Sequence, residues 1–214
     1  IGFVGIDDSS EMVARCNDNF KALKVKRPYE IQLADLNQGV KIENASMEDP
    51  KDANYLAISM IMKAYLFQNL VDCYGDVPYS EAFKADEGSF KPKYDAQQGI
   101  YEDLVVKLDE AMAIIQNAPA DVNELNSSSD IIYAGDMGLW LKFANTLKLR
   151  ILIHQSGMAG RDTYISSNIA TTASIGYLGA GEGAKANPGY LVSDGKMNNF
   201  YETFYRANGS SQSD

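Results

Sequence analysis

The feature that most constrains the fold is a run of apolar residues between Tyr55 and Val71, which is followed at once by a short bend. Apolar side chains fill most positions of this run, so a helix formed by it has almost no polar face and must be covered on most sides. The polar residues within it and at its two ends are Asn54, Lys63, Gln68, Asn69 and Asp72. They are too frequent for a membrane span. We therefore expect a buried central helix.

The bend has the sequence Tyr74-Gly75-Asp76-Val77-Pro78. Gly75 can adopt the left-handed conformation that caps a helix, and Pro78 removes a backbone donor and disfavours helical geometry at Val77. Asp76 is placed to accept hydrogen bonds from N–H groups of the bend. We interpret Gly75, Asp76 and Pro78 as structural residues of this loop.

Apolar residues at three- and four-residue steps predict further helices on both sides of the central one. These helices cover about 8–24, 29–39, 95–115, 137–156 and 161–171. Asp95 is predicted to cap its helix, with Gln98 at the capping-box position. Asp136 is predicted to cap the following one, in which Trp140 begins an apolar stripe.

The remaining segments are poor in periodic apolar residues. They are 41–52, 80–94, 117–129 and, rich in glycine, 176–214, with at most a brief helix near 198–205. Residues 130–133 are predicted to form a short extended piece, and strand patterns are almost absent elsewhere.

Together these patterns predict an all-α fold of antiparallel helix pairs with long irregular loops. We expect a single domain over 1–214, with a helical scaffold at about 8–172 and an irregular region at about 173–214.

Composition excludes several classes of function. The 214 residues carry a formal net charge of −10, which argues against nucleic acid as a partner because phosphate binding needs a clustered basic surface. His154 is the only histidine, and Cys16 and Cys73 are the only cysteines, so an ordinary zinc site cannot be built. We expect both cysteines to behave as small apolar residues, and a disulfide between them stays open. His154 is predicted to be a structural histidine near the buried end of its helix.

A catalytic constellation is not predicted. Asp72 and Asp76 could be read as a glycosidase pair, but that chemistry needs two carboxylates held at a defined separation across a sugar. Four residues apart at a helix end, they fit better as acceptors for N–H groups. No cofactor or metal is predicted; calcium held by loop oxygens is compatible with the composition but is not predicted.

Thirteen tyrosines suit a role in sugar binding, because an aromatic face stacks on a sugar ring while polar groups bind its hydroxyls. The aromatic residues in helical stripes are expected to be core; they are Tyr55, Tyr65, Tyr101 and Trp140. Loop aromatics are free to meet a ligand, and among them we predict Tyr190, Tyr201 and Tyr205 as ligand-binding residues.

Three ordered motifs carry a family resemblance: KAYLFQNLVDCYGDVPYSEAFK (63–84), PKYDAQQGIYEDLVVKLDEA (92–111) and DIIYAGDMGLWLKFANTLKLRILI (130–153). Over about 33–156 the chain resembles the SusD-like (SusD/RagB) outer-membrane lipoproteins of Bacteroidetes. The resemblance implies tetratricopeptide-like helix pairs and non-enzymatic binding of a glycan, oligosaccharide or other nutrient. It also implies a SusC-like TonB-dependent transporter as partner, and a lipid-anchored position on the outer face of the outer membrane.

The best-known sugar contacts of that family do not map onto a motif here, so none is carried over. The resemblance also leads us to expect a chain that is incomplete at both ends, without its leader and lipid-attachment cysteine and without the family's C-terminal part. Two alternatives stay open: a helical-repeat scaffold that binds only other proteins, and an enzyme that hydrolyses glycans.

Overall fold

The computed structural model describes residues 43–44, 46–84, 91–125, 127, 130–185, 190–191 and 197. Its longer helices are α3 (Ala53–Tyr74), α4 (Gln97–Gln116), α5 (Met137–His154) and α6 (Asp162–Thr172). The short elements are the 3-10 turns η1 (Pro50–Asp52) and η3 (Ala173–Ile175) and the two-residue strands β1 (Val77–Pro78) and β2 (Tyr94–Asp95). The helices predicted over 8–24 and 29–39 and the brief helix near 198–205 lie outside the described residues.

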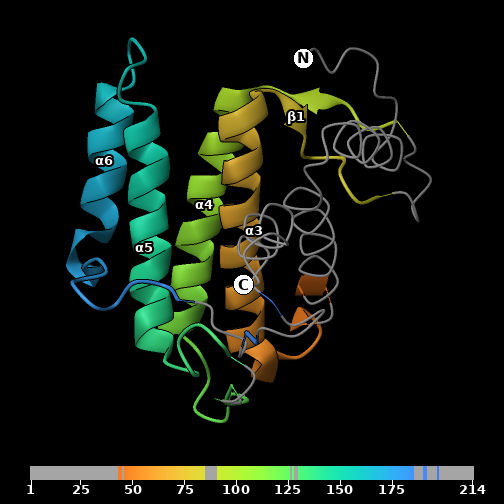
Figure 1. Ribbon diagram of the computed structural model, residues 1–214, viewed down its shortest axis with the longest axis vertical. Coiled ribbons are helices and arrows are strands. Elements are labelled where there is room, and N and C mark those ends of the chain that lie inside the picture. Colours follow the sequence, from red (N-terminus) through yellow and green to blue (C-terminus); the bar gives the residue numbers. More distant parts are fainter. Residues whose placement is uncertain are drawn as a thin grey trace, which may run out of the picture.

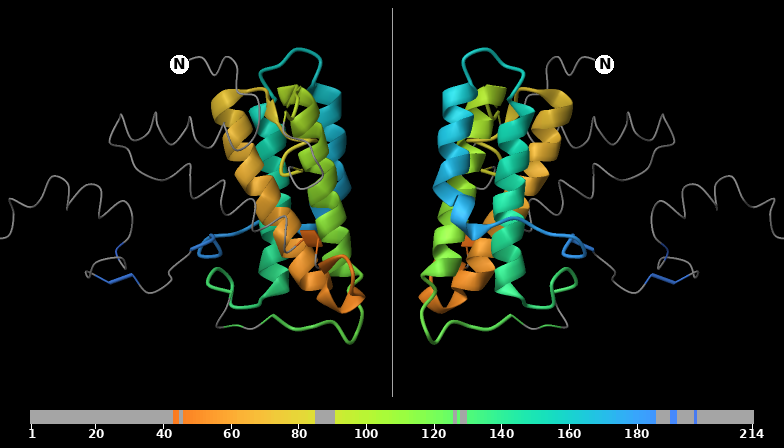
Figure 2. Two further views of the ribbon diagram at one scale, coloured as in Figure 1. Left: turned by 90° about the vertical axis from the view of Figure 1, so that its right-hand side faces the viewer. Right: turned by 90° about the vertical axis from the view of Figure 1, so that its left-hand side faces the viewer.

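The four long helices stand side by side and alternate in direction (Figures 1 and 2). The antiparallel pairs are α3 with α4 and α5 with α6, and α5 also packs against α4 and α3. The predicted all-α fold of antiparallel helix pairs is therefore confirmed. Tetratricopeptide-like stacking and a single domain over the whole chain stay predictions.

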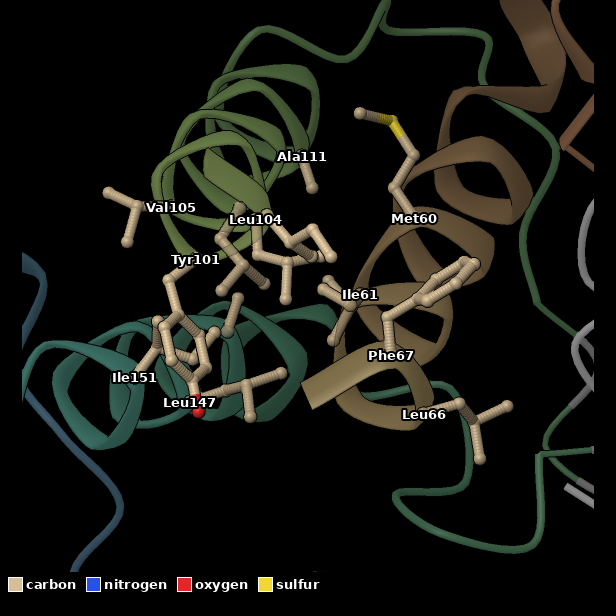
Figure 3. Close-up of a cluster of buried hydrophobic side chains, with 14 of the residues drawn as sticks. Met60, Ile61, Leu66, Phe67, Tyr101, Leu104, Val105, Ala111, Leu147 and Ile151 are labelled. Carbon is tan, nitrogen blue, oxygen red and sulfur yellow. The ribbon is translucent and has the colours of Figure 1, made fainter. Parts of the chain in front are cut away.

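The core lies where α3, α4 and α5 meet (Figure 3). Ile61 of α3, Leu108 of α4 and Ile151 of α5 are fully buried. The expected burial of the central helix is confirmed for these contacts, and Tyr101 and Trp140 are buried as predicted. Tyr55 is not: it is 37% exposed, because it lies in the first turn of α3 beside an open groove.

The predicted caps give one confirmation and one correction. Asp136 caps α5, with its carboxylate accepting from the Leu139 N–H at 3.0 Å. Asp95 does not cap α4, whose N-cap is Ala96 without a side-chain bond. The reason is that Asp95 belongs to β2 and pairs with Val77 of β1, so its carboxylate accepts instead from the backbone N–H groups of Tyr79 and Ser80.

The segment before α5 is also different from the prediction. Residues 131–135 form turns and not an extended piece. The Asp130 carboxylate organises them by accepting from the N–H groups of Ile132, Tyr133 and Gly135 and from the Trp140 indole N–H at 2.8 Å. Gly135 has a positive φ of 88°, and a Cβ there would lie 3.1 Å from the Leu125 carbonyl oxygen. The turn thus depends on a glycine and on one carboxylate.

A buried lysine ties three helices together. The Lys148 side chain on α5 is 1% exposed, and its Nζ lies 2.7 Å from Asp109 Oδ1 on α4 and 2.9 Å from Thr171 Oγ1 on α6. A charge so deeply buried is tolerated only when it is paired and hydrogen-bonded. Lys148 therefore fixes the relative positions of these helices as well as filling space.

The Asp130 turn predicts a specific loss of stability. In the Asp130→Asn variant an NH2 group replaces one of the two accepting oxygens and faces donors. Either the N–H groups of Trp140 and Gly135 or those of Ile132 and Tyr133 then lack an acceptor, which destabilises the fold by about 1–3 kcal/mol. Denaturant unfolding of the purified chain measures this loss. Asp136→Asn is the matched control, because asparagine caps a helix about as well as aspartate. Equal stability of the two variants would contradict this account of the turn.

The same carboxylate predicts destabilisation by acid. Burial raises the pKa of Asp130, but hydrogen bonds from Trp140, Gly135, Ile132 and Tyr133 outweigh burial and lower the pKa below its usual value. A lowered pKa in the folded state stabilises the protein above the unfolded-state pKa, and this contribution is lost as the pH falls through the folded-state value. Unfolding free energy should therefore decrease below about pH 4. Asp130→Asn should show a shallower acid decrease than the unmodified chain in chemical denaturation between neutral and acidic pH.

Candidate functional site

The loop after α3 is held by backbone geometry and short-range contacts. Gly75 has φ 74° and ψ −118°, and its N–H donates to the Val71 carbonyl oxygen at 2.9 Å. Its positive φ agrees with the glycine requirement, but this ψ lies outside the left-handed cap region and is open to glycine alone. Pro78 lies in β1 opposite Tyr94. This geometry lets the chain leave α3 and pair at once with β2.

The two carboxylates that could have formed a catalytic pair have separate partners. Asp76 Oδ1 accepts from the Gln97 N–H at 2.8 Å, which is the first N–H of α4. Asp72 Oδ1 accepts from the Tyr101 hydroxyl at 2.5 Å. Burial, and then this hydrogen bond, raise the pKa of Tyr101 to about 12, so its hydroxyl stays protonated and donates. Asp76 thus joins the loop to α4, and Asp72 joins α3 to α4.

A third contact of this group involves His154. It is the last residue of α5, and its Nδ1 lies 3.1 Å from Asp72 Oδ2 and 3.4 Å from Gln68 Nε2. Its side chain is 40% exposed, so the predicted buried position is wrong, because α5 ends at His154, before the expected stop at Gly157. Cys73 in the last turn of α3 is also exposed and not core. Cys16 lies outside the described residues.

The described residues offer neither a metal cluster nor a membrane-spanning helix. No group of three or more His, Cys, Asp or Glu side chains in that part of the chain is arranged to hold a metal ion. None of the helices the structure describes combines the length and apolar character needed to cross a bilayer.

The predicted ligand-binding tyrosines are only partly described. Tyr190 is 47% exposed, whereas Tyr201 and Tyr205 lie outside the described residues. Phe83 packs against Phe67 with ring centroids 6.3 Å apart and adopts a positive φ of 61°. Phe83 therefore packs against the hydrophobic core. Tyr94 is 41% exposed.

The segment 172–182, which precedes Tyr190 in the sequence, is bonded to α5 by residues that were not predicted from the sequence. Asn145 is buried and donates to the carbonyl oxygens of Thr172 and Gly176, at 3.0 and 2.8 Å. Lys142 Nζ lies 2.8 Å from Glu182 Oε1. Both belong to the sequence Trp140-Leu-Lys-Phe-Ala-Asn145. Polar residues on an otherwise apolar helix were the feature of the sequence that could have indicated these contacts. The motif holds the chain on both sides of α5, since Trp140 binds Asp130.

Two hollows are lined by described residues. One, of about 270 Å³, lies between α3 and the turn before α5 and is lined by Tyr55, Ile58, Met62, Leu125, Asp130, Ile131, Ile132 and Trp140. The other, of about 430 Å³, lies at the start of α3 and the end of α4, with Met47, Leu56 and Ile114 among its residues. The first offers one carboxylate, Asp130, which already accepts from four donors. Asp130 is therefore already used by the protein, and the exposed ring of Tyr55 is the aromatic face that this hollow offers.

Comparisons with known proteins agree with the fold. A family described as "Starch-binding associating with outer membrane", of SusD-like type, matches residues 9–179. A solved structure of a chitin-binding protein is 31% identical, with a TM-score of 0.57, and the match covers 72% of this chain and 33% of that one. A SusD/RagB family protein from Bacteroides thetaiotaomicron is 28% identical, with a TM-score of 0.58 and coverage of 73% and 30%.

A SusD homolog from Bacteroides uniformis, 23% identical, shares the fold with a TM-score of 0.64, over 82% of this chain and 35% of that one. The chain thus spans about a third of the length of these solved structures. The search of curated proteins gave no match. Because the family match extends over most of the sequence and includes the three motifs of the central helices, the chain belongs to the SusD-like family.

Proposed function

We propose that this chain is part of a non-enzymatic cell-surface protein that binds glycans or oligosaccharides for import. The observation that carries the proposal is the match of residues 9–179 to a family described as starch-binding and associated with the outer membrane. The similarity to a chitin-binding protein supports a carbohydrate as the ligand. The proposed partner is a SusC-like TonB-dependent transporter, and the proposed location is the outer face of the outer membrane, through a lipid anchor.

The described structure supports binding without cleavage. A glycosidase needs carboxylates that face the substrate with a defined separation. Asp72, Asp76, Asp95 and Asp130 instead accept hydrogen bonds from neighbouring protein groups. A frame that is held in this way suits a binding protein, because a rigid scaffold lowers the entropic cost of placing ligand contacts.

Tyr190, Tyr201 and Tyr205 are the proposed ligand contacts. Tyr190 is exposed and follows the segment that Lys142 and Asn145 hold on α5. An exposed tyrosine offers a flat apolar face and a hydroxyl, which fits the alternating C–H and O–H surface of a sugar ring.

Binding can be measured by isothermal titration calorimetry of the chain with chitooligosaccharides and maltooligosaccharides. We expect Tyr190→Ala to weaken binding by about 0.5–1.5 kcal/mol, roughly two- to tenfold in Kd, because one stacking contact is lost. Tyr94→Ala is the matched control, since Tyr94 is similarly exposed but lies in β2. Binding of peptides with no affinity for any oligosaccharide would instead favour the protein-binding scaffold.

Cleavage can be tested separately. The chain should release no shorter products from the same oligosaccharides during long incubation, as followed by chromatography. Asp76→Asn should change only stability, by less than about 1 kcal/mol, because asparagine retains an oxygen for the Gln97 N–H. Product release that disappears in Asp76→Asn would overturn the non-enzymatic proposal.

A further inference from the structure

Arg150 of α5 has no carboxylate partner among the described residues. Most lysine and arginine side chains in that part of the chain lie within ion-pair distance of an aspartate or glutamate: Lys51, Lys63, Lys93, Lys107, Lys142, Lys148 and Arg161. The other exceptions are Lys84, Lys91 and Lys185, and each is the terminal residue of a described segment. Arg150 lies within a helix, in a chain with 29 Asp and Glu against 19 Lys and Arg. A cation that stays unpaired where acids are in excess is available to an anion from outside the protein.

Three neutral side chains of α3 hold the Arg150 guanidinium in place. Its Nε donates to Oε1 of Gln68 at 2.9 Å, and Gln68 is 0% exposed. Its Cζ lies 5.5 Å from the ring centroid of Tyr65, which is within the range of a cation–π contact. Its Nη2 lies 3.4 Å from Oδ1 of Asn69, which is a long hydrogen bond. The guanidinium is therefore oriented by α3, while its charge is not neutralised by these contacts.

The next acidic residue of α3, Asp72, has other partners. Its Oδ1 accepts from the Tyr101 hydroxyl, and its Oδ2 lies 3.1 Å from Nδ1 of His154. Asp72 follows Asn69 by about one helical turn, and His154 follows Arg150 by about one turn. The negative charge of Asp72 therefore still acts on this surface. It makes a singly charged anion more favourable there than a doubly charged one.

The exposed side of Arg150 keeps donors for a ligand. The side chain belongs to an exposed residue, and a guanidinium carries five N–H groups. One on Nε and one on Nη2 have the partners named above, so those on Nη1 and the second on Nη2 have none among the described residues. Parallel N–H groups on Nη1 and Nη2 match the two oxygens of a carboxylate. The half-buried Asn69 lies beside this edge and carries an amide NH2.

We propose that Arg150 binds the carboxylate of an acidic sugar unit, such as a uronic acid, with Asn69 donating to a neighbouring sugar oxygen. The inference rests on the proposed function and narrows its ligand to oligosaccharides that carry carboxylates. A carboxylate is planar and singly charged, so it fits both the guanidinium edge and the nearby charge of Asp72. A phosphate monoester carries nearly two charges at neutral pH and fits this surface less well.

Isothermal titration calorimetry of the 214-residue chain tests the proposal at physiological ionic strength, where distant surface acids are screened. The ligands are oligogalacturonides and maltooligosaccharides of matched length. The chain should bind the uronate ligand more tightly, and Arg150→Gln should reduce this preference by about five- to tenfold, because charge-assisted hydrogen bonds at an exposed site are lost. Lys107→Gln is the matched control: it removes the same charge from a lysine that already pairs with Glu110, and it should leave the preference unchanged.

The other outcomes separate this proposal from the proposed function. Equal binding of the two ligands, or an equal loss of preference in Arg150→Gln and Lys107→Gln, would overturn the carboxylate site and leave sugar binding in place. Tighter binding of a sulfated oligosaccharide of the same length would also overturn it, since the anion would then be a sulfate ester. Binding of no oligosaccharide would overturn both proposals.

A second variant covers the case in which Arg150→Gln does not fold. Arg150→Lys keeps the charge but replaces the planar guanidinium by a single ammonium group. It should lower the preference for the uronate ligand by a smaller factor than Arg150→Gln. Full retention of the preference in Arg150→Lys would show that charge alone is sufficient, and would overturn the assignment of a guanidinium–carboxylate pair. Thermal unfolding of both variants checks that the chain is folded.

Discussion

The contact between the apolar sides of α3 and α4 is the interaction on which the other described elements depend. Ile61 from α3 and Leu104 and Leu108 from α4 are almost completely buried, and α5 packs on the same cluster. Each such side chain stabilises the fold by about 1.5–3 kcal/mol relative to an exposed one. A surface ion pair such as Lys107–Glu110 contributes about 0–1 kcal/mol. Apolar packing therefore sets the arrangement, and polar contacts adjust it.

The acidic residues act mainly where the backbone leaves a helix or enters one. Asp76 binds the first N–H of α4, Asp95 binds the loop after β1, and Asp130 and Asp136 hold the entry to α5. At such places N–H groups lack helical partners, and a carboxylate is a strong acceptor for them. These four carboxylates thus hold the loops that join the described helices.

The structure could be predicted from the sequence where one local rule decides it. The boundaries of α3 and α4 and the cap of α5 follow from apolar periodicity and from Asp136. Residues whose local pattern competes with a distant partner could not be predicted in this way. Asp95 looks like a cap, but the pairing of β2 with β1 takes its carboxylate elsewhere. Tyr55 lies on an apolar stripe, yet the groove beside it leaves the ring exposed. Ligand-binding residues were harder still to predict from the sequence, because loop aromatics such as Tyr190 belong to no periodic pattern.

The helix motif from Trp140 to Asn145 connects the frame to the proposed binding residues. Trp140 holds the turn before α5, while Lys142 and Asn145 hold the segment after α6. One helix therefore positions two loops that are far apart in the sequence. Loops carry ligand contacts, but they hold a ligand well only when their ends are fixed. A buried polar side chain destabilises the fold unless it is hydrogen-bonded. Asn145 and Lys142 make their bonds to the end of α6 and to the segment that follows it. The motif therefore holds two loops in place, in addition to its part in the core.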